Sequence, residues 1–159
     1  MIAVGKYSEA ESLLVPMVQK DPDDPELHFL LGKVYLYTDH PAAEAEHQFD
    51  LAAVNAKWKP KIARAYSDAF DVVLRGDDDT KAGEYMVQAT RADESLKDDA
   101  CRRLAPAVEQ RHTDGKTYRN LLRAEGAIGG ACAAVAVKQI RSLISGSDKI
   151  LDIAMLTDV

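Results

Sequence analysis

The sequence predicts an all-α fold built from a repeated pair of antiparallel helices. One helical packing pattern recurs three times in the first 94 residues, and capping and turn residues fall between its occurrences. No segment shows the sustained period-two alternation of a half-buried strand. We therefore expect a helical content well above the average of about one third for globular proteins, and no sheet.

The repeated pattern is an alanine, a larger apolar residue four positions later and a further apolar residue three positions after that. At about 100° per residue these positions share one narrow stripe of a helix, which allows close packing on a neighbour. The three sets are Ala10, Leu14 and Met17; Ala45, Phe49 and Ala52; and Ala82, Met86 and Ala89. In the helices that precede the second and third sets, Gly32 and Ser67 are the small residues at which two helices can approach closely.

Capping and turn residues predict where the first five helices lie. Ser8 is a candidate cap for a helix that runs to Gln19. Asp24, Pro25 and Glu26 place a capping acid, a first-turn proline and an early acid at the next start. The remaining signals are a turn at 39–41, a proline at position 60 that opens the fourth helix, and an acidic turn at 76–80.

Beyond residue 94 the repeated pattern fades. We expect helices at 95–110, 116–125, 131–145 and 148–156, with a turn at 112–115 and a glycine-rich break or close-packing site at 126–130. Residues 1–94 are therefore predicted to form the repeats, and residues 95–159 a helical extension or degenerate repeats. Because a repeat array needs a cap over its last apolar face, this extension is a candidate cap.

The pattern in residues 5–94 resembles the tetratricopeptide repeat (TPR) family, whose signature combines Trp-x-x-Leu-Gly-x-x-Tyr, Ala-x-x-x-Phe and a closing Pro with a period near 34. The second unit matches at Leu31, Gly32, Tyr35, Ala45, Phe49 and Ala52, with His28 in place of the Trp. The first unit matches its back half at Gly5, Tyr7, Ala10, Leu14, Met17 and Pro22. The third is looser, with Ser67 for the Gly, Phe70 for the Tyr and Glu94 for the Pro.

The resemblance implies a right-handed solenoid of antiparallel helix pairs. Since the first unit lacks its front helix, we expect a fragment of a longer protein; a native chain that begins with half a repeat is the alternative. An ordinary helical bundle is the alternative to the solenoid.

The resemblance also implies a concave groove, lined by front helices, that binds a peptide or helix of a partner protein. By register, the groove residues are Glu26, Phe29, Lys33, Leu36 and Tyr37 in the second unit, and Lys61, Arg64, Asp68 and Val72 in the third. This apolar and basic mixture would complement a segment with an apolar anchor and an acid. A clamp for a chaperone's C-terminal carboxylate is not expected, because Phe29 and Asp68 stand where that clamp has Lys or Asn.

Composition restricts the function further. The net charge of −6 argues against a general nucleic-acid binder, which needs a basic surface. No apolar run approaches the roughly 20 residues of a spanning helix, and no signal peptide is visible, so we expect a cytoplasmic protein without membrane insertion. For Cys101 and Cys132, which stand 31 residues apart, two buried free thiols are favoured over one disulfide.

Two pairs, Glu44 with His47 and Glu109 with His112, have the Glu-x-x-His spacing of di-metal carboxylate bundles. At about 100° per residue, however, His47 points away from the stripe that contains Ala45. We therefore predict a protein-binding adaptor or scaffold with no enzymatic activity, metal or cofactor. The alternatives are a structural subunit that forms homodimers through its groove or C-terminal helices and, last, a di-metal enzyme.

Two smaller features have structural interpretations. The acidic turn at 77–79 is predicted to be a solvated capping turn rather than a cation site. Trp58, between two lysines, is predicted to anchor a loop.

Overall fold

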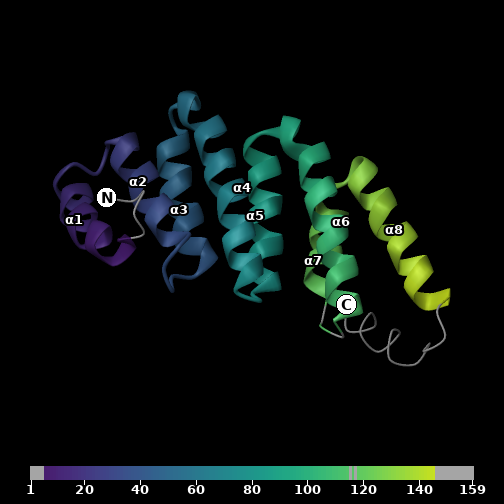
Figure 1. Ribbon diagram of the computed structural model, residues 1–159. Helices are drawn as coiled ribbons and strands as arrows, with labels where there is room; N and C mark the ends of the chain where they lie inside the picture. The colour runs from purple at the N-terminus through teal and green to yellow at the C-terminus, as the bar shows by residue number, and fades with distance from the viewer. Residues whose placement is uncertain (1–5, 115, 117, 146–159) are drawn as a thin grey trace. The chain divides into compact units, whose positions relative to one another are not determined.

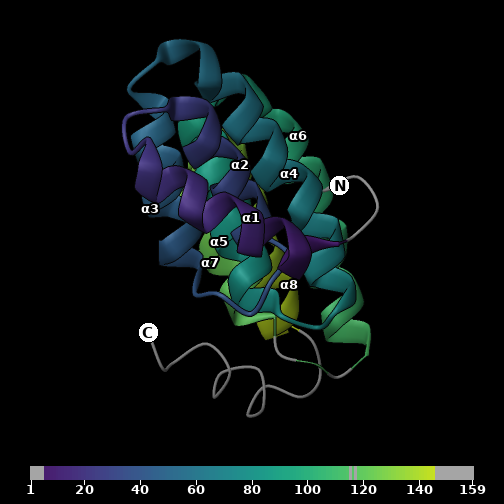
Figure 2. The ribbon, with the colours of Figure 1, turned by 90° about the vertical axis from the view of Figure 1, so that its left-hand side faces the viewer.

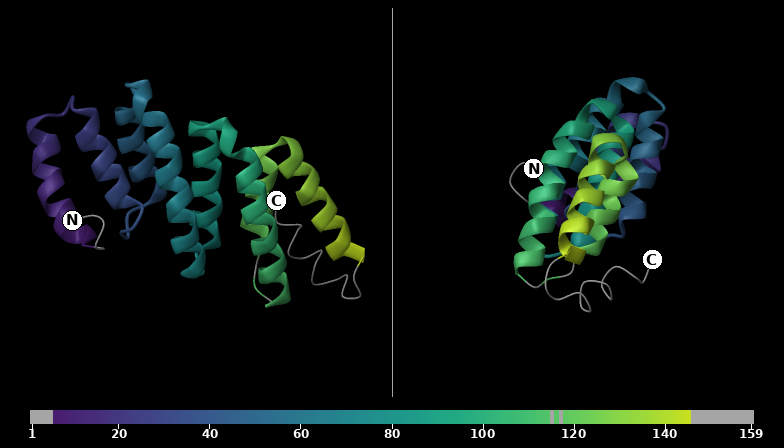
Figure 3. Two further views of the ribbon diagram at one scale, coloured as in Figure 1. Left: turned by 45° about the horizontal axis from the view of Figure 1, so that its top comes forward. Right: turned by 90° about the vertical axis from the view of Figure 1, so that its right-hand side faces the viewer.

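The computed structural model describes residues 6–114, 116 and 118–145 of the chain, with the side chains of 143 and 144 left aside, and 85% of these residues are helical. They form eight α-helices and two short 3₁₀ helices, and no strand occurs among them (Figure 1). Figures 2 and 3 show the same helices from other sides. The predicted all-α fold class is confirmed for this part of the chain.

The helices follow one another through short connections. The first half of the chain contains α1 (Tyr7–Lys20), α2 (Pro25–Tyr35), α3 (Ala42–Ala53), η2 (Ala56–Trp58) and α4 (Lys59–Arg75). The second half contains α5 (Asp79–Ala92), η3 (Glu94–Leu96), α6 (Lys97–Thr113), α7 (Arg119–Ile128) and α8 (Gly130–Ser145). The predicted helix at 148–156 lies outside the described residues.

Internal contacts divide the chain into two compact units, residues 1–69 and 70–159. The helix α4 spans the boundary between them. The division predicted at residue 94, where the repeat pattern fades, falls inside the second unit, so the end of the pattern does not coincide with this division.

Two of the predicted capping positions act as caps, whereas Ser8 does not: it lies inside α1, whose N-cap residue is Lys6 and has no side-chain cap hydrogen bond. The Asp24 carboxylate accepts a hydrogen bond of 2.8 Å from the backbone N–H of Glu26, and Pro25 is the first residue of α2. The Asp78 carboxylate accepts one of 3.0 Å from the backbone N–H of Lys81 at the start of α5. These oxygens satisfy N–H groups that the first turn of a helix leaves without a partner.

In the first unit, α2 packs on both α1 and α3. Ala45, Phe49 and Ala52 are all buried, so the predicted stripe faces the interior. A Cβ atom on Gly32 would lie 2.8 Å from the ring of Phe49, which shows that the glycine permits the close approach of α2 and α3.

Met17 is the exception among the stripe residues. It was expected to pack with Ala10 and Leu14, which are buried, but it is 50% exposed. The core formed by Ala10 and Leu14 with residues of α2 is contacted by Val18 and not by Met17, so the buried stripe of α1 continues at position 18.

In the second unit, α7 packs on α5, α6 and α8 (Figures 1 and 3). The third stripe of Ala82, Met86 and Ala89 is buried. Its first two members join a core that includes Leu104 of α6 and Leu121 of α7.

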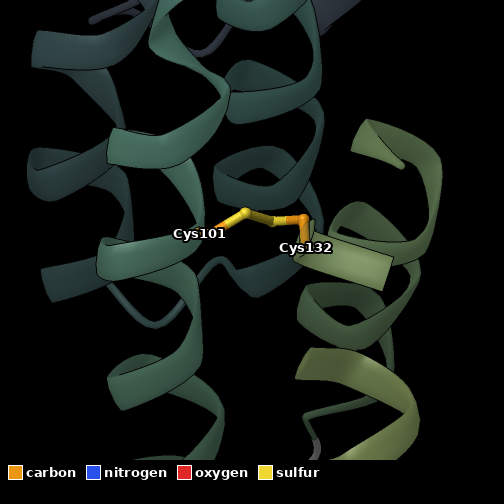
Figure 4. The surroundings of a disulfide bond; sticks show 2 residues. All are labelled: Cys101 and Cys132. Carbon is orange, nitrogen blue, oxygen red and sulfur yellow. A yellow bond between two sulfur atoms is a disulfide. The ribbon is translucent and has the colours of Figure 1, made fainter. Parts of the chain in front are cut away.

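The prediction of two free thiols was wrong. Cys101 of α6 and Cys132 of α8 form a disulfide, with Cα atoms 5.1 Å apart (Figure 4). Separation in sequence does not reveal that two helices bring their thiols together, whereas the packing of α6 on α8 does.

The end of α7 also differs from the prediction. The helix continues through Gly126 to Ile128, and a Cβ on Gly126 would meet nothing within 4 Å, so this glycine is neither a break nor a close-packing site. The break comes at Gly129, whose φ of +78° lies in the left-handed region that favours glycine. No helix among the described residues is long and apolar enough to cross a membrane.

Candidate functional site

A cluster of aromatic rings in the first unit centres on Trp58. The Asn55 side chain caps η2 by accepting a hydrogen bond of 3.2 Å from the backbone N–H of Lys57, and this turn holds Trp58 at 5% exposure. The Phe29 ring of α2 stacks on the indole with centroids 4.9 Å apart, and also lies 6.0 Å from the Phe49 ring. Trp58 therefore anchors the connection between α3 and α4, as predicted.

Two lysine side chains lie over the Trp58 ring of this cluster. The ammonium of Lys61 lies 4.2 Å from the centre of the Trp58 ring, and that of Lys57 lies 5.4 Å from it. These distances suit the attraction between a cation and the face of an indole. Arg64 stands one helical turn beyond Lys61.

On α2, Lys33 stands one turn beyond Phe29. We call the set of six residues the Trp58 surface; it consists of Phe29, Lys33, Lys57, Trp58, Lys61 and Arg64. Phe29 is only half-buried, whereas Lys57, Lys61 and Arg64 are exposed.

None of the four cations of the Trp58 surface takes part in an ion pair within the described part of the chain. In the second unit, by contrast, two arginines take part in ion pairs. Arg103 lies 2.9 Å from Asp71, and Arg111 lies 2.8 Å from both Asp77 and Asp79. In a chain with a net charge of −6, this leaves a local concentration of positive charge available to a partner.

The other residues predicted from the register are placed as follows. Glu26 is exposed in the first turn of α2, and Asp68 is exposed on α4. Leu36 is 1% exposed, so its side chain belongs to the core and cannot meet a partner. Val72 is exposed but belongs to the second unit.

Tyr37 lies in a separate aromatic pair. Its ring stacks on that of Tyr7 with centroids 4.7 Å apart. Burial, with smaller contributions from Tyr7 and from the negative charge of Asp68, raises the pKa of the Tyr37 hydroxyl to about 12. The structure thus brings Phe29 and Lys61 together through Trp58, and places Tyr37 within the electrostatic reach of Asp68.

The predicted groove omitted Lys57 and Trp58, because the family register supplies positions only from front helices. The signal in the sequence was the tryptophan between two lysines just before a proline-opened helix. Trp58 belongs instead to the connecting turn η2, whose side-chain cap at Asn55 fixes its path.

The Glu-x-x-His pair of α3 has a different arrangement from that of a metal site. His47 is exposed, as the helical phase predicted. Glu44 is instead within 2.7 Å of Nδ1 of His40, whose Nε2 lies 2.9 Å from Glu11 of α1. No group of three or more His, Cys, Asp and Glu side chains placed to hold a metal occurs among the described residues.

The acidic turn before α5 is neutralised from within the second unit. Besides its pairing with Asp77 and Asp79, Arg111 donates a hydrogen bond of 2.7 Å to the carbonyl of Leu74. Lys116 donates to Asp77 at 2.9 Å, and this hydrogen bond holds the pKa of the Asp77 carboxyl below its usual value. The predicted capping role belongs to Asp78, whereas Asp77 and Asp79 are held in ion pairs and are not simply solvated as predicted.

No protein-family model matches the chain, and no curated protein or solved structure is significantly similar to it. The function is therefore inferred from the Trp58 surface and from the chain's own sequence pattern.

Proposed function

We propose that this chain is a protein-interaction module of the TPR kind, which binds a partner segment at the Trp58 surface and catalyses no reaction. The observation that carries the proposal is the pair of lysines, Lys57 and Lys61, over the ring of Trp58 beside the half-buried Phe29. Lys33 and Arg64 follow one helical turn after Phe29 and Lys61. An apolar side chain of a partner would pack against Phe29, and acidic side chains beside it would meet the cations. Aromatic and arginine residues dominate the binding energy of many protein interfaces.

Two features support a repeat arrangement of the helices. The stripes centred on Phe49 and Met86 are buried at equivalent positions of α3 and α5. In the second unit, contacts between α5 and α7 advance in the same direction along both helices, as expected for corresponding helices of successive units: Thr80 meets Asn120, and Gly83 meets both Asn120 and Ala124.

The test is a selection of partner segments followed by measured affinities. A displayed library of random 12-residue peptides is selected on the full chain, and enriched peptides are labelled for fluorescence anisotropy. We expect enrichment of peptides with acidic residues beside a large apolar residue. The double variant Lys61→Glu with Arg64→Glu should bind them at least about tenfold more weakly, which corresponds to about 1.4 kcal/mol.

The matched control is the double variant Lys20→Glu with Lys138→Glu. Both residues are exposed, on α1 and α8, and the change in net charge is the same. Equal loss of affinity in the two double variants would mean that only net charge matters, and would contradict a site at the Trp58 surface. Tighter binding of a single-stranded oligonucleotide than of any selected peptide would point to nucleic acid instead.

Self-association is the second candidate, and α1 provides the observation that favours it. Leu13 and Met17, one turn apart, each expose about half of their surface. If two chains meet through this face, light scattering will show a mass that rises with concentration, and Met17→Glu will abolish the rise. A constant monomer mass would remove this candidate.

A further inference from the structure

A groove of about 330 Å³ lies between α5 and α7 in the second unit. Small residues bring the two helices close: a Cβ on Gly83 would lie 3.0 Å from the carbonyl oxygen of Asn120 and 3.2 Å from Cβ of Ala124. At one end, Asn120 donates a hydrogen bond of 2.6 Å to the hydroxyl of Thr80. The two helices are neighbours (Figure 1), and they approach most closely at Gly83.

Each helix contributes an arginine to the groove. Arg91 of α5 and Arg123 of α7 both line it and are exposed, and Glu84 is its one acidic lining residue. Arg91 has no ion pair within the described residues, unlike Arg103 and Arg111 of the same unit. The guanidinium group offers paired N–H donors that fit a carboxylate.

The shape of the groove restricts what can occupy it. The lining residues of α5 run from Thr80 to Arg91, which spans roughly 16 Å of helix at about 1.5 Å per residue. This length matches about three turns of a bound helix. Its floor includes small residues such as Gly83 and Ala124, which leave room for the apolar side chains of an occupant.

We propose that the α5–α7 groove is a second protein-binding site, which takes an acidic helical segment of a partner. The segment places small apolar side chains against the floor and carboxylates against Arg91 and Arg123, in the manner of a helix bound in a groove. This site is separate from the Trp58 surface and does not depend on the function proposed for that surface.

The test uses a defined probe and the full chain. A 14-residue helical peptide, alanine with glutamate at every fourth position, is titrated into the ¹⁵N-labelled protein. We expect saturable shifts of the backbone amide signals of Gly83, Asn120 and Ala124. The same peptide with lysine in place of glutamate should produce no such shifts.

Variants separate this site from the other one. The double variant Arg91→Glu with Arg123→Glu should weaken binding of the glutamate peptide at least tenfold, whereas Lys61→Glu with Arg64→Glu should leave the shifts on α5 and α7 unchanged. Lys138→Glu with Arg141→Glu, two exposed residues of α8, is the charge-matched control. The proposal is overturned if millimolar glutamate peptide moves no signal on α5 or α7, if the lysine peptide moves the same signals, or if the arginine double variant binds normally.

Discussion

At the scale of single residues, His40 links two helices of the first unit through its two ring nitrogens. Burial disfavours the charged imidazole, but the hydrogen bonds to Glu11 and Glu44 outweigh this effect, so the pKa of His40 is raised above 6.5. A raised pKa means that the folded state holds the proton more tightly than the unfolded state. This contribution to the free energy of unfolding is therefore complete below pH 6.5 and is lost as the pH rises through the raised pKa.

We predict that His40→Gln lowers the free energy of unfolding by about 0.5–1 kcal/mol at pH 5.5, the upper part of the range for partly exposed ion pairs. At pH 9 the loss should be smaller, because the imidazole is then neutral in both states. Urea unfolding at the two pH values measures the difference. His47→Gln is the control, since His47 is exposed on α3; a similar pH dependence in both variants would refute the role given to His40.

The second residue-scale prediction concerns Glu125 of α7, which is fully buried and whose carboxylate oxygens have no hydrogen-bond partner among the described residues. Burial, together with the negative charge of Glu109, raises the pKa of Glu125 to about 7 from its ordinary 4.5. Between these two values the folded state binds the proton and the unfolded state does not. The contribution of Glu125 to stability therefore falls as the pH rises from 4.5 to 7, and remains low above 7.

The variant Glu125→Gln should not show this loss of stability between pH 4.5 and pH 7. We expect the variant to be more stable than the parent by about 1 kcal/mol at pH 8, within the range for relief of an unsatisfied buried group, and nearly equal to it at pH 4.5. Melting temperatures across this pH range give the comparison. A difference in melting temperature between variant and parent that is the same at every pH would show that Glu125 does not change its protonation over this range in the folded protein.

At the scale of elements, the phase of α3 makes a matched pair of positions. Ala45 is buried in the contact with α2, whereas His47, two residues on, is exposed. Ala45→Trp should lower the free energy of unfolding by about 1–3 kcal/mol or more, because a large side chain overpacks a close helix contact. His47→Trp should stay within about 0.5 kcal/mol of the parent, and equal effects on the melting temperature would contradict the assigned phase.

The helix α3 also illustrates which features of the fold could be predicted from the sequence alone. The stripe of Ala45, Phe49 and Ala52 follows directly from the 3.6-residue period, because burial on one face of a helix is a local property. Caps such as Asp24 are equally local. The exposure of Met17 was mispredicted because it depends on which neighbour covers α1. The disulfide between Cys101 and Cys132 was missed because the pairing of two cysteines depends on how distant helices pack.

The candidate site, too, was predicted only in part from the sequence. Phe29, Lys61 and Arg64 were expected at a binding surface from their register, and the structure groups the first two around one indole. The central position of Trp58 depends on the turn η2, whose three-dimensional path the register does not contain. The groove between α5 and α7 depends on the close approach at Gly83, which the sequence pattern did not indicate.

At the scale of the whole molecule, the disulfide lies within the second unit and the Trp58 surface lies within the first. Disulfides persist in oxidising compartments and are uncommon in the cytosol, whereas the cytoplasmic location stays a prediction from the sequence. The disulfide joins α6 and α8, which both belong to the second unit, so its direct constraint acts within that unit.

We therefore predict that Cys101→Ser with Cys132→Ser lowers the free energy of unfolding of the second unit by about 2–4 kcal/mol, as is typical for loss of a native disulfide. Hydrogen exchange monitored by mass spectrometry should show faster exchange in α6 and α8 and unchanged exchange in α1, α2 and α3. Peptides selected on the Trp58 surface should bind the double variant with unchanged affinity, because their contacts all lie in residues 29–64. If the variant instead exchanges faster throughout the first unit and loses these peptides, the two units do not unfold separately, and the disulfide supports the binding surface as well as the helices it joins.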